Sequence, residues 1–134
     1  LFDAYRQFYK QEANLELAKE FISARLKNNE SFILIAENET KTAIGFTQLY
    51  PSFCSVAATP IYTLYDLFVS PDSRQFGVGK MLLEHAYRHA KDNHIARMDL
   101  TTAKNNVAAQ SLYESLGWIK DNIYFAYNKH VYSV

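Results

Sequence analysis

The chain has 134 residues, a length typical of one globular domain, and we expect residues 1–134 to form a single domain. Its 14 basic and 14 acidic residues cancel, so net charge gives no reason to expect nucleic acid or an anionic membrane as a partner. The single cysteine, Cys54, excludes an internal disulfide framework, and no apolar run approaches the roughly 18 residues of a membrane span. These features, with no signal-peptide pattern at the start, predict a cytoplasmic protein.

Apolar residues at helical spacing predict two helices at the start of the chain. The first covers residues 1–11, and the second begins at Asn14, a residue type that commonly caps helices. Two short strands follow, "SFILIAE" (31–37) and "TAIGFTQLY" (42–50), and the turn residues between them favour an antiparallel pair. The chain starts in mid-helix without an initiating methionine, so we expect a leading segment to be missing.

The middle of the chain contains its most apolar strand. We expect a loop between Pro51 and Pro60, followed by a central strand, "IYTLYDLFV" (61–69), whose composition is typical of strands covered on both faces. A helix then runs to about Asn93, and the alternation in "RMDLTT" (97–102) predicts a further strand. The buried stripe of that helix is expected to consist of Val78, Met81, Leu82, Ala86 and Ala90.

The last part of the chain predicts a short helix and a closing strand. Asn105 or Asn106 is a suitable N-cap, and Gly117 stands where a C′ glycine ends a helix. The segment "YFAYNKHVY" (124–132) is expected to be the final strand. The order of elements predicts an α+β (mixed α/β) fold with one strand–helix–strand crossover.

Two of only four glycines, Gly77 and Gly79, stand between the central strand and the helix that follows it. Unpaired N–H groups and the dipole at a helix N-terminus bind anions, and missing Cβ atoms allow a phosphate to approach the main chain. Arg74 and Lys80 can add charge-assisted contacts. This turn is therefore a candidate anion site that needs no net positive charge.

The spacing of these residues discriminates among phosphate-binding motifs. The pattern G-x-x-x-x-G-K-[ST] of nucleotide hydrolases is absent, and the dinucleotide pattern G-x-G-x-x-G fails because Leu82 stands where its last glycine belongs. What remains is R-x-x-G-x-G. The segment by itself leaves open a turn that binds no ligand.

Two segments together, "LYDLFVSPDSRQFGVGKMLL" and "NNVAAQSLYESLGW", resemble the GNAT superfamily of N-acetyltransferases. The resemblance covers residues 31–130. It implies an acyl-CoA N-acyltransferase fold with a mostly antiparallel twisted sheet and flanking helices. The first strand of that fold is not in the chain, which agrees with the start in mid-helix.

The same resemblance implies that acetyl-coenzyme A is the co-substrate. Its pyrophosphate is expected at the glycine turn, and its pantetheine arm beside the "LFV" end of the central strand. A bulge at the end of that strand would splay it from the 97–102 strand and admit the acetyl group, and a main-chain N–H near Leu67 would bind the thioester oxygen. The expected coenzyme-binding residues are Leu67, Phe68, Val69, Arg74, Gln75, Phe76, Gly77, Val78, Gly79, Lys80, Asn106, Ala109 and Tyr113.

The resemblance also suggests catalytic roles for Tyr113 and Asp66. Tyr113 matches a family tyrosine that protonates the departing thiolate, and its ordinary pKa near 10 lets it hold the proton until then; the alternative is a packing role. Asp66 is a carboxylate in an apolar strand, so it acts as base, binds the acceptor cation, or is a structural acid. Several family members place glutamate where this chain has Tyr65, so a water chain remains an alternative base.

Other reactive residues have weaker support. His85 and His89 lie four residues apart on one predicted helix, but "EHAYRH" is not a zinc motif, and we expect no metal. Cys54 has no orienting base nearby in sequence, and the family needs no covalent enzyme intermediate.

Residues 44–69 are similar to the corresponding region of the diamine and thialysine acetyltransferases, and "YRQFYKQ" is similar to small histone- or polyamine-acetylating members. This favours a small-molecule primary amine as acceptor, with protein or peptide amines and antibiotics as alternatives. A coenzyme-binding regulatory module without turnover also stays open. The resemblance further implies a homodimer. Aromatic side chains that could face the ammonium group are Tyr5, Tyr9, Tyr50, Phe53, Tyr62 and Tyr65.

Overall fold

The computed structural model describes residues 1–132. Residues 1–101 form one compact unit, and a second unit begins at Thr102; each is described by itself. None of the helices within the described residues is long and apolar enough to cross a membrane.

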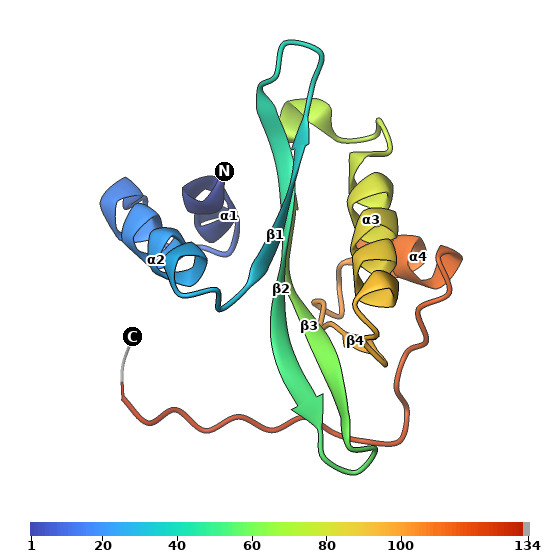
Figure 1. Cartoon of the computed structure of the whole chain (residues 1–134). Coiled ribbons are helices and arrows are strands. Elements are labelled where there is room, and N and C mark those ends of the chain that lie inside the picture. The colour runs from blue at the N-terminus through green and yellow to red at the C-terminus, as the bar shows by residue number, and fades with distance from the viewer. Residues whose placement is uncertain (133–134) are drawn as a thin grey trace. The chain divides into compact units, whose positions relative to one another are not determined.

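The first unit contains a four-stranded sheet in the order β1-β2-β3-β4. The first three strands are antiparallel neighbours, and β4 runs parallel to β3 after the crossover through α3. Helices α1 and α2 cover one face of this sheet and α3 covers the other (Figure 1). The mixed fold with one crossover is confirmed. The bounds are α1 Phe2–Phe8, α2 Leu15–Lys27, β1 Phe32–Glu37, β2 Ala43–Cys54, β3 Thr59–Val69, α3 Val78–Asp92 and β4 Met98–Asp99.

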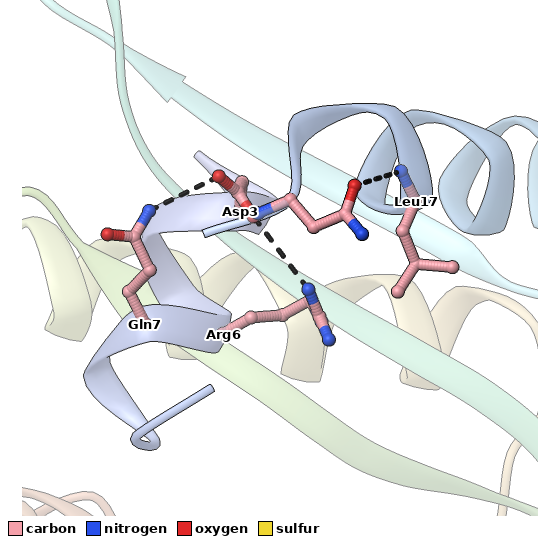
Figure 2. A network of polar contacts seen from close by, with 5 residues as sticks. Asp3, Arg6, Gln7 and Leu17 are labelled. Atoms are coloured by element: carbon pink, nitrogen blue, oxygen red, sulfur yellow. Dashed lines mark hydrogen bonds and ion pairs between the residues drawn. The ribbon is translucent and has the colours of Figure 1, made fainter. Parts of the chain in front are cut away.

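A polar network ties α1 to the start of α2 (Figure 2). The Asp3 carboxylate accepts hydrogen bonds from the Gln7 side chain (3.2 Å) and the Asn14 main-chain N–H (3.0 Å), and pairs with Arg6 at 3.8 Å. Asn14 is confirmed as the N-cap of α2, because its side chain accepts from the Leu17 N–H at 3.1 Å. The network holds α1 in a defined position, although this helix is shorter than the predicted 1–11.

The expected loop between Pro51 and Pro60 is wrong. Strands β2 and β3 run through both prolines and are joined by a turn at residues 55–58. The last residue of β2 that pairs with β1 is Leu49, so within residues 1–132 the far half of β2 has one side without a neighbouring strand. Proline lacks an N–H donor and is tolerated at the unpaired edge of a sheet. This explains why Pro51 can belong to β2, where it pairs with Tyr62 of β3.

Helix α3 packs on the sheet through a face slightly rotated from the predicted one. Met81 was expected to be buried but is 53% exposed, whereas Leu83 is only 1% exposed. The neighbouring residues Leu82 and Leu83 are both buried, because the apolar stripe of a helix that packs on a sheet is wide enough to include both. The other predicted stripe residues are confirmed as buried, namely Val78, Leu82, Ala86 and Ala90.

Strand β4 is much shorter than the predicted strand at 97–102. Only Met98 and Asp99 pair with β3, opposite Tyr62 and Thr63. Within the described residues, the segment from Leu64 to Val69 of β3 therefore has no strand beside it on the β4 side. This leaves the end of β3 with one open edge.

The second unit contains helix α4 (Val107–Ser115). Asn106 is confirmed as its N-cap, since the side chain accepts from the Ala109 N–H at 3.2 Å, and Gly117 follows with a φ of +90°. The predicted strand at 124–132 is wrong, because these residues join no ladder in the structure. Alternating aromatic residues favour a strand, but a strand also needs a partner for its main-chain groups.

Candidate active site

The turn between β3 and α3 has an unusual main-chain conformation. A short 3-10 helix, Pro71–Ser73, precedes two residues in the left-handed region, Gln75 with φ +72° and Gly77 with φ +75°. Glycine adopts this conformation freely, but for a residue such as Gln75 it is uncommon, and rarely populated conformations cost roughly 1–3 kcal/mol. Positive φ angles also occur at Lys10, Asn29, Lys41, Ala58 and His94, so the conformation of Gln75 indicates a tight turn and does not by itself indicate a binding role.

The N-terminus of α3 has no side-chain cap, because Gly77 occupies the N-cap position. Among the described residues, the N–H groups of Val78, Gly79 and Lys80 have no hydrogen-bond partner, and the first turn carries no acidic side chain. A Cβ built at Gly77 meets nothing within 4 Å, so the space beside Gly77 is open. The arrangement suits an anion such as a phosphate.

Gly79 lies inside the first turn of α3, where its φ is not positive. Any residue can adopt that main-chain conformation, so conformation alone does not require glycine at this position. A close approach of a ligand to the main chain does require the absence of a Cβ. Gly79 therefore fits the same anion site as the free N–H groups.

Arg74 reaches back from the turn to the sheet and α1. Its Nε donates to the Val69 carbonyl oxygen at 2.9 Å, and its guanidinium lies 5.4 Å from the Phe8 ring and 5.6 Å from the Phe68 ring. Sequence reasoning placed Arg74 on the anion. The structure adds a structural task, because the side chain also holds the turn against the end of β3.

A β-bulge lies in β3 at Tyr65. Gln48 pairs with Asp66 while the next residue, Leu49, pairs with Leu64, so Tyr65 is the extra residue. The expected bulge lay at the end of this strand, on the side of the 97–102 strand; the observed one is earlier and faces β2. It turns Tyr65 outward, 68% exposed, and leaves Asp66 buried at 3% exposed.

Asp66 is a buried carboxylate without a cation. Gln48 Nε2 donates to its Oδ2 at 2.6 Å, and the Tyr5 hydroxyl, which donates to the Tyr65 main-chain oxygen at 3.4 Å, is a neighbour of the same carboxyl group. Burial raises the pKa of Asp66, and the neighbouring Tyr5 hydroxyl and Gln48 amide offset part of that rise. No ion pair involving Asp66 exists among residues 1–132. Its negative charge is thus not balanced by any cation among these residues.

Sequence reasoning missed Gln48 as the hydrogen-bond partner of Asp66. Gln48 is 0% exposed and lies within the apolar strand β2, just as Asp66 does within β3. A buried polar residue needs a partner, so two polar positions in neighbouring apolar strands were the signal that could have paired them. The bulge, which sets the register, could not be located from the sequence.

Tyrosine side chains surround this carboxylate. Burial, and then the neighbouring Asp66, raise the pKa of Tyr5 well above its ordinary range and that of Tyr50 to about 12. Tyr65 contacts Tyr50 edge to face at 5.7 Å, and Tyr9 contacts Tyr5 at 5.1 Å. The structure therefore gathers Tyr5, Tyr50 and Tyr65 near Asp66, with Tyr9 against Tyr5, as aromatic groups that can face a cation.

The remaining aromatic and reactive residues lie elsewhere. Tyr62 lies beside His89 on the α3 side, with its hydroxyl 3.2 Å from Nε2 and ring centroids 5.7 Å apart, and Phe32 stacks on that imidazole at 3.5 Å. Phe53 belongs to the far end of the β2–β3 hairpin. No group of three or more potential metal ligands occurs in the described part of the chain. The Cys54 thiol lies 3.9 Å from Arg97 Nη1, away from Asp66 along the hairpin.

The second unit holds the other predicted site residues. Asn106 uses its side-chain oxygen to cap α4, which also contains Ala109 and Tyr113. The Tyr113 ring lies 6.1 Å from Trp118, and the Tyr113 carbonyl accepts from the Trp118 N–H at 3.0 Å. A ligand role for Asn106 and an acid role for Tyr113 stay predictions.

Comparisons with known proteins agree on one family. Residues 1–118 match the family model described as "Acetyltransferase (GNAT) family". An uncharacterized N-acetyltransferase, YhfO of Bacillus subtilis, is 47% identical over 95% of this chain and 85% of its own length. The crystal structure of a probable acetyltransferase, 34% identical, superposes with a TM-score of 0.93 over 99% of this chain and 89% of that one. A ribosomal protein bS18-alanine N-acetyltransferase of Salmonella typhimurium is 39% identical over 42% of this chain and 38% of its own.

We expect Asp66→Asn to raise the midpoint temperature of unfolding at about pH 8, because it removes a buried charge and keeps an oxygen for Gln48. The folded-state pKa of Asp66 is raised, so its destabilising effect is full above that pKa and disappears as the pH falls through it toward the ordinary value of 3.8. The advantage of asparagine should therefore shrink on acidification. Calorimetry across this pH range checks it, with exposed Asp72→Asn as control; a variant that is less stable at every pH would contradict it.

Proposed function

Because the chain belongs to the acetyltransferase (GNAT) family, we propose that it is an N-acetyltransferase that moves an acetyl group from acetyl-coenzyme A to a primary amine. Transfer occurs by direct attack of the amine in a ternary complex. The observation that carries the choice of a primary amine is Asp66, a buried carboxylate that has no cation among the described residues and lies among tyrosine rings.

The turn before α3 fits the pyrophosphate of the co-substrate. Uncapped N–H groups of Val78, Gly79 and Lys80 and the open space at Gly77 are what a diphosphate ester requires. The open edge of β3, which includes Leu67 to Val69, offers main-chain groups to the amide-containing pantetheine arm. When bound, acetyl-coenzyme A supplies an acetyl group activated as a thioester. Phe76, Asn106 and Ala109 are further expected contacts.

The acceptor end of the site would take a small amine on a flexible chain, of polyamine or lysine type. Asp66 supplies the single negative charge that attracts an ammonium group, and Tyr5, Tyr50 and Tyr65 supply aromatic faces. All of these residues belong to the first unit of the structure. Tyr5 of α1 and Tyr9, just after α1, are the proposed contacts for the part of the acceptor beyond its amine.

Two proton transfers accompany the reaction. The acceptor ammonium must lose a proton before its nitrogen can attack, and Asp66, with a pKa raised toward the operating pH, is the proposed base. The departing thiolate must gain a proton, and Tyr113 is the proposed acid. A main-chain N–H near Leu67 stabilises the negative charge that develops on the carbonyl oxygen.

Two alternatives have specific support. The partial match to an alanine N-acetyltransferase of a ribosomal protein favours a protein N-terminus as acceptor. Tyr65, where several family members have glutamate, favours a regulatory module that binds the coenzyme without turnover. The three functions differ in which amine, if any, releases free thiol.

The deciding experiment measures thiol release from acetyl-coenzyme A with a panel of polyamines, lysine analogues, aminoglycosides and peptides with free N-termini. We expect release with small primary amines. Thiol release with peptides alone would indicate that the acceptor is a protein N-terminus. Thermal stabilisation by coenzyme A without release from any amine would support the regulatory module.

We expect Gly79→Val to weaken coenzyme A binding by at least about tenfold, because the added side chain occupies the approach to the first turn of α3. Valine can adopt the helical conformation at this position, which makes it a cleaner change than one at Gly77, whose φ is +75°. Calorimetric titration measures the affinity. The matched control is Glu84→Val, an exposed position on the same helix. Equal affinity for Gly79→Val and the unaltered protein would place the pyrophosphate elsewhere.

Tyr113→Phe should lower turnover by roughly 10²-fold or more, the range of general acid catalysis, because phenylalanine cannot donate a proton. Binding of coenzyme A should stay nearly unchanged, since the ring remains to pack beside Trp118. Steady-state kinetics and titration separate the two effects. Tyr87→Phe, at an exposed position of α3, is the control. Unchanged turnover of Tyr113→Phe would remove the acid role.

We also propose that the protein is a homodimer joined through residues 119–132, here called the C-terminal segment. It exposes four large aromatic side chains, Tyr124, Phe125, Tyr127 and Tyr132, each at least 74% accessible, and no described residue of it lies in a ladder. Aromatic side chains bury about 150–250 Å² each, so these four from two copies reach the area of a standard stable interface. A second copy also offers sheet edges for its main-chain groups.

Paired substitution of Phe125→Asp and Tyr127→Asp should convert the dimer to a monomer, because the charges cannot be buried in an apolar interface. Light scattering coupled to size-exclusion chromatography measures the mass. Asp121→Asn in the same segment is the control. A monomeric unaltered protein would remove the proposal.

A further inference from the structure

A chain of two side-chain hydrogen bonds leads from the start of β1 to Asp66. The Ser31 hydroxyl donates to Gln48 Oε1 at 2.7 Å, and Gln48 Nε2 donates to Asp66 Oδ2 at 2.6 Å. Gln48 and Asp66 are 0% and 3% exposed, so water cannot replace either partner at the second bond. The state of Asp66 therefore depends on what Gln48 presents to it.

The carboxamide of Gln48 has one donor end and one acceptor end. With Asp66 ionised, the donor Nε2 must face the carboxylate, and the acceptor Oε1 faces the Ser31 hydroxyl, as the structure has it. With Asp66 protonated, a half-turn of the amide satisfies every group again. The Asp66 O–H then donates to Oε1, and Nε2 donates to the Ser31 oxygen, because a hydroxyl can both donate and accept.

This two-way pairing matters because a buried polar atom without a partner is costly. A leucine or methionine at position 48 would leave either form of Asp66 without this partner. A glutamate would pair with only one form. Glutamine lets the carboxyl group change its protonation state with no loss of hydrogen bonds at Oδ2.

We propose that Gln48 is a positioning residue for acetyl transfer, which holds ionised Asp66 for the acceptor ammonium and turns its amide over when Asp66 takes the proton. The inference rests on the proposed function. In this step an N–H bond of the ammonium breaks and an O–H bond forms on Asp66, so a positive and a negative group become two neutral ones. The nitrogen keeps the electron pair that attacks the thioester.

Other titratable groups near Asp66 come from the elements packed against it. Tyr5 of α1, Tyr50 of β2 and Tyr65 of β3 lie beside it, Tyr9 lies beside Tyr5, and Arg25 and Glu30 act on Tyr50. Tyr5 and Tyr50 are held neutral by burial and by Asp66 itself. Substitution of Asp66 identifies which titration belongs to this carboxyl group.

The first test follows Asp66 directly. Carbon-13 NMR of the aspartate carboxyl groups in the whole chain, without any substrate, gives its titration, and Asp66→Asn assigns the signal. In Gln48→Met the midpoint should rise by roughly one pH unit or more, because the ionised form loses a donor. Thr47→Val is the matched control: Thr47 is equally buried and donates at 2.8 Å to the main-chain oxygen of Asp66, not to its carboxylate. It should leave the midpoint unchanged.

The second test follows the reaction. The acidic limb of the kcat/KM profile should move upward in Gln48→Met by the shift seen in NMR, with activity regained at higher pH. Should Gln48→Met not fold, Ser31→Ala removes the partner of Oε1 and should move both measurements in the same direction by less.

The outcomes separate two failures. A shifted NMR midpoint with an unmoved kinetic limb, or an unmoved midpoint in an active protein, would overturn the role of Gln48 alone. Absence of thiol release from the unaltered protein would remove the acetyl-transfer function, and this role with it.

Discussion

The bond between Gln48 Nε2 and Asp66 Oδ2, 2.6 Å long and closed to water, is the contact on which the candidate acceptor site depends. It joins β2 to β3 beside the bulge at Tyr65. The extra residue changes which side chains of β3 face α1, so that Asp66 meets both Gln48 and Tyr5. In a regular strand, the neighbouring side chains of Tyr65 and Asp66 would point to opposite faces of the sheet, so only one of them could lie on the α1 face.

A buried carboxylate with no cation is a poor choice for stability alone. Its burial opposes ionisation, and its hydrogen bonds compensate only in part. Proteins retain such groups most often where chemistry uses them, because a pKa moved toward neutrality suits proton transfer. The surrounding tyrosines are consistent with this, since they add aromatic surface without adding a charge that would neutralise Asp66.

Opposite electrostatic features occur within one strand and the turn after it. Asp66 offers a negative charge in β3, and the uncapped N–H groups of α3 offer partial positive charge soon afterwards in the chain. Each is local, in a molecule whose formal charges sum to +0. The N-terminus of α3 thus suits the anionic end of the proposed acyl donor, and Asp66 suits the cationic acceptor.

Features that depend on neighbours in the chain could be predicted from the sequence. The caps at Asn14 and Asn106, the glycine after α4 and the β3–α3–β4 crossover were all confirmed, because cap chemistry and apolar periodicity act within a few residues. The glycine turn was located for the same reason. The loop expected at residues 51–60 was wrong, because whether a proline can stay in a strand depends on the strand beside it, and β1 stops pairing at Leu49.

The sequence by itself determined the family, the secondary structure around the turn and the identity of Asp66 as an unusual carboxylate. Only the tertiary structure decided that Gln48 is its partner and that Tyr5, Tyr50 and Tyr65 surround it, while Tyr62 packs with His89 on the other side. The physical reason is register. One extra residue in β3 shifts every later side chain by one position, and nothing in a single strand's pattern reveals where the partner strand accommodates it.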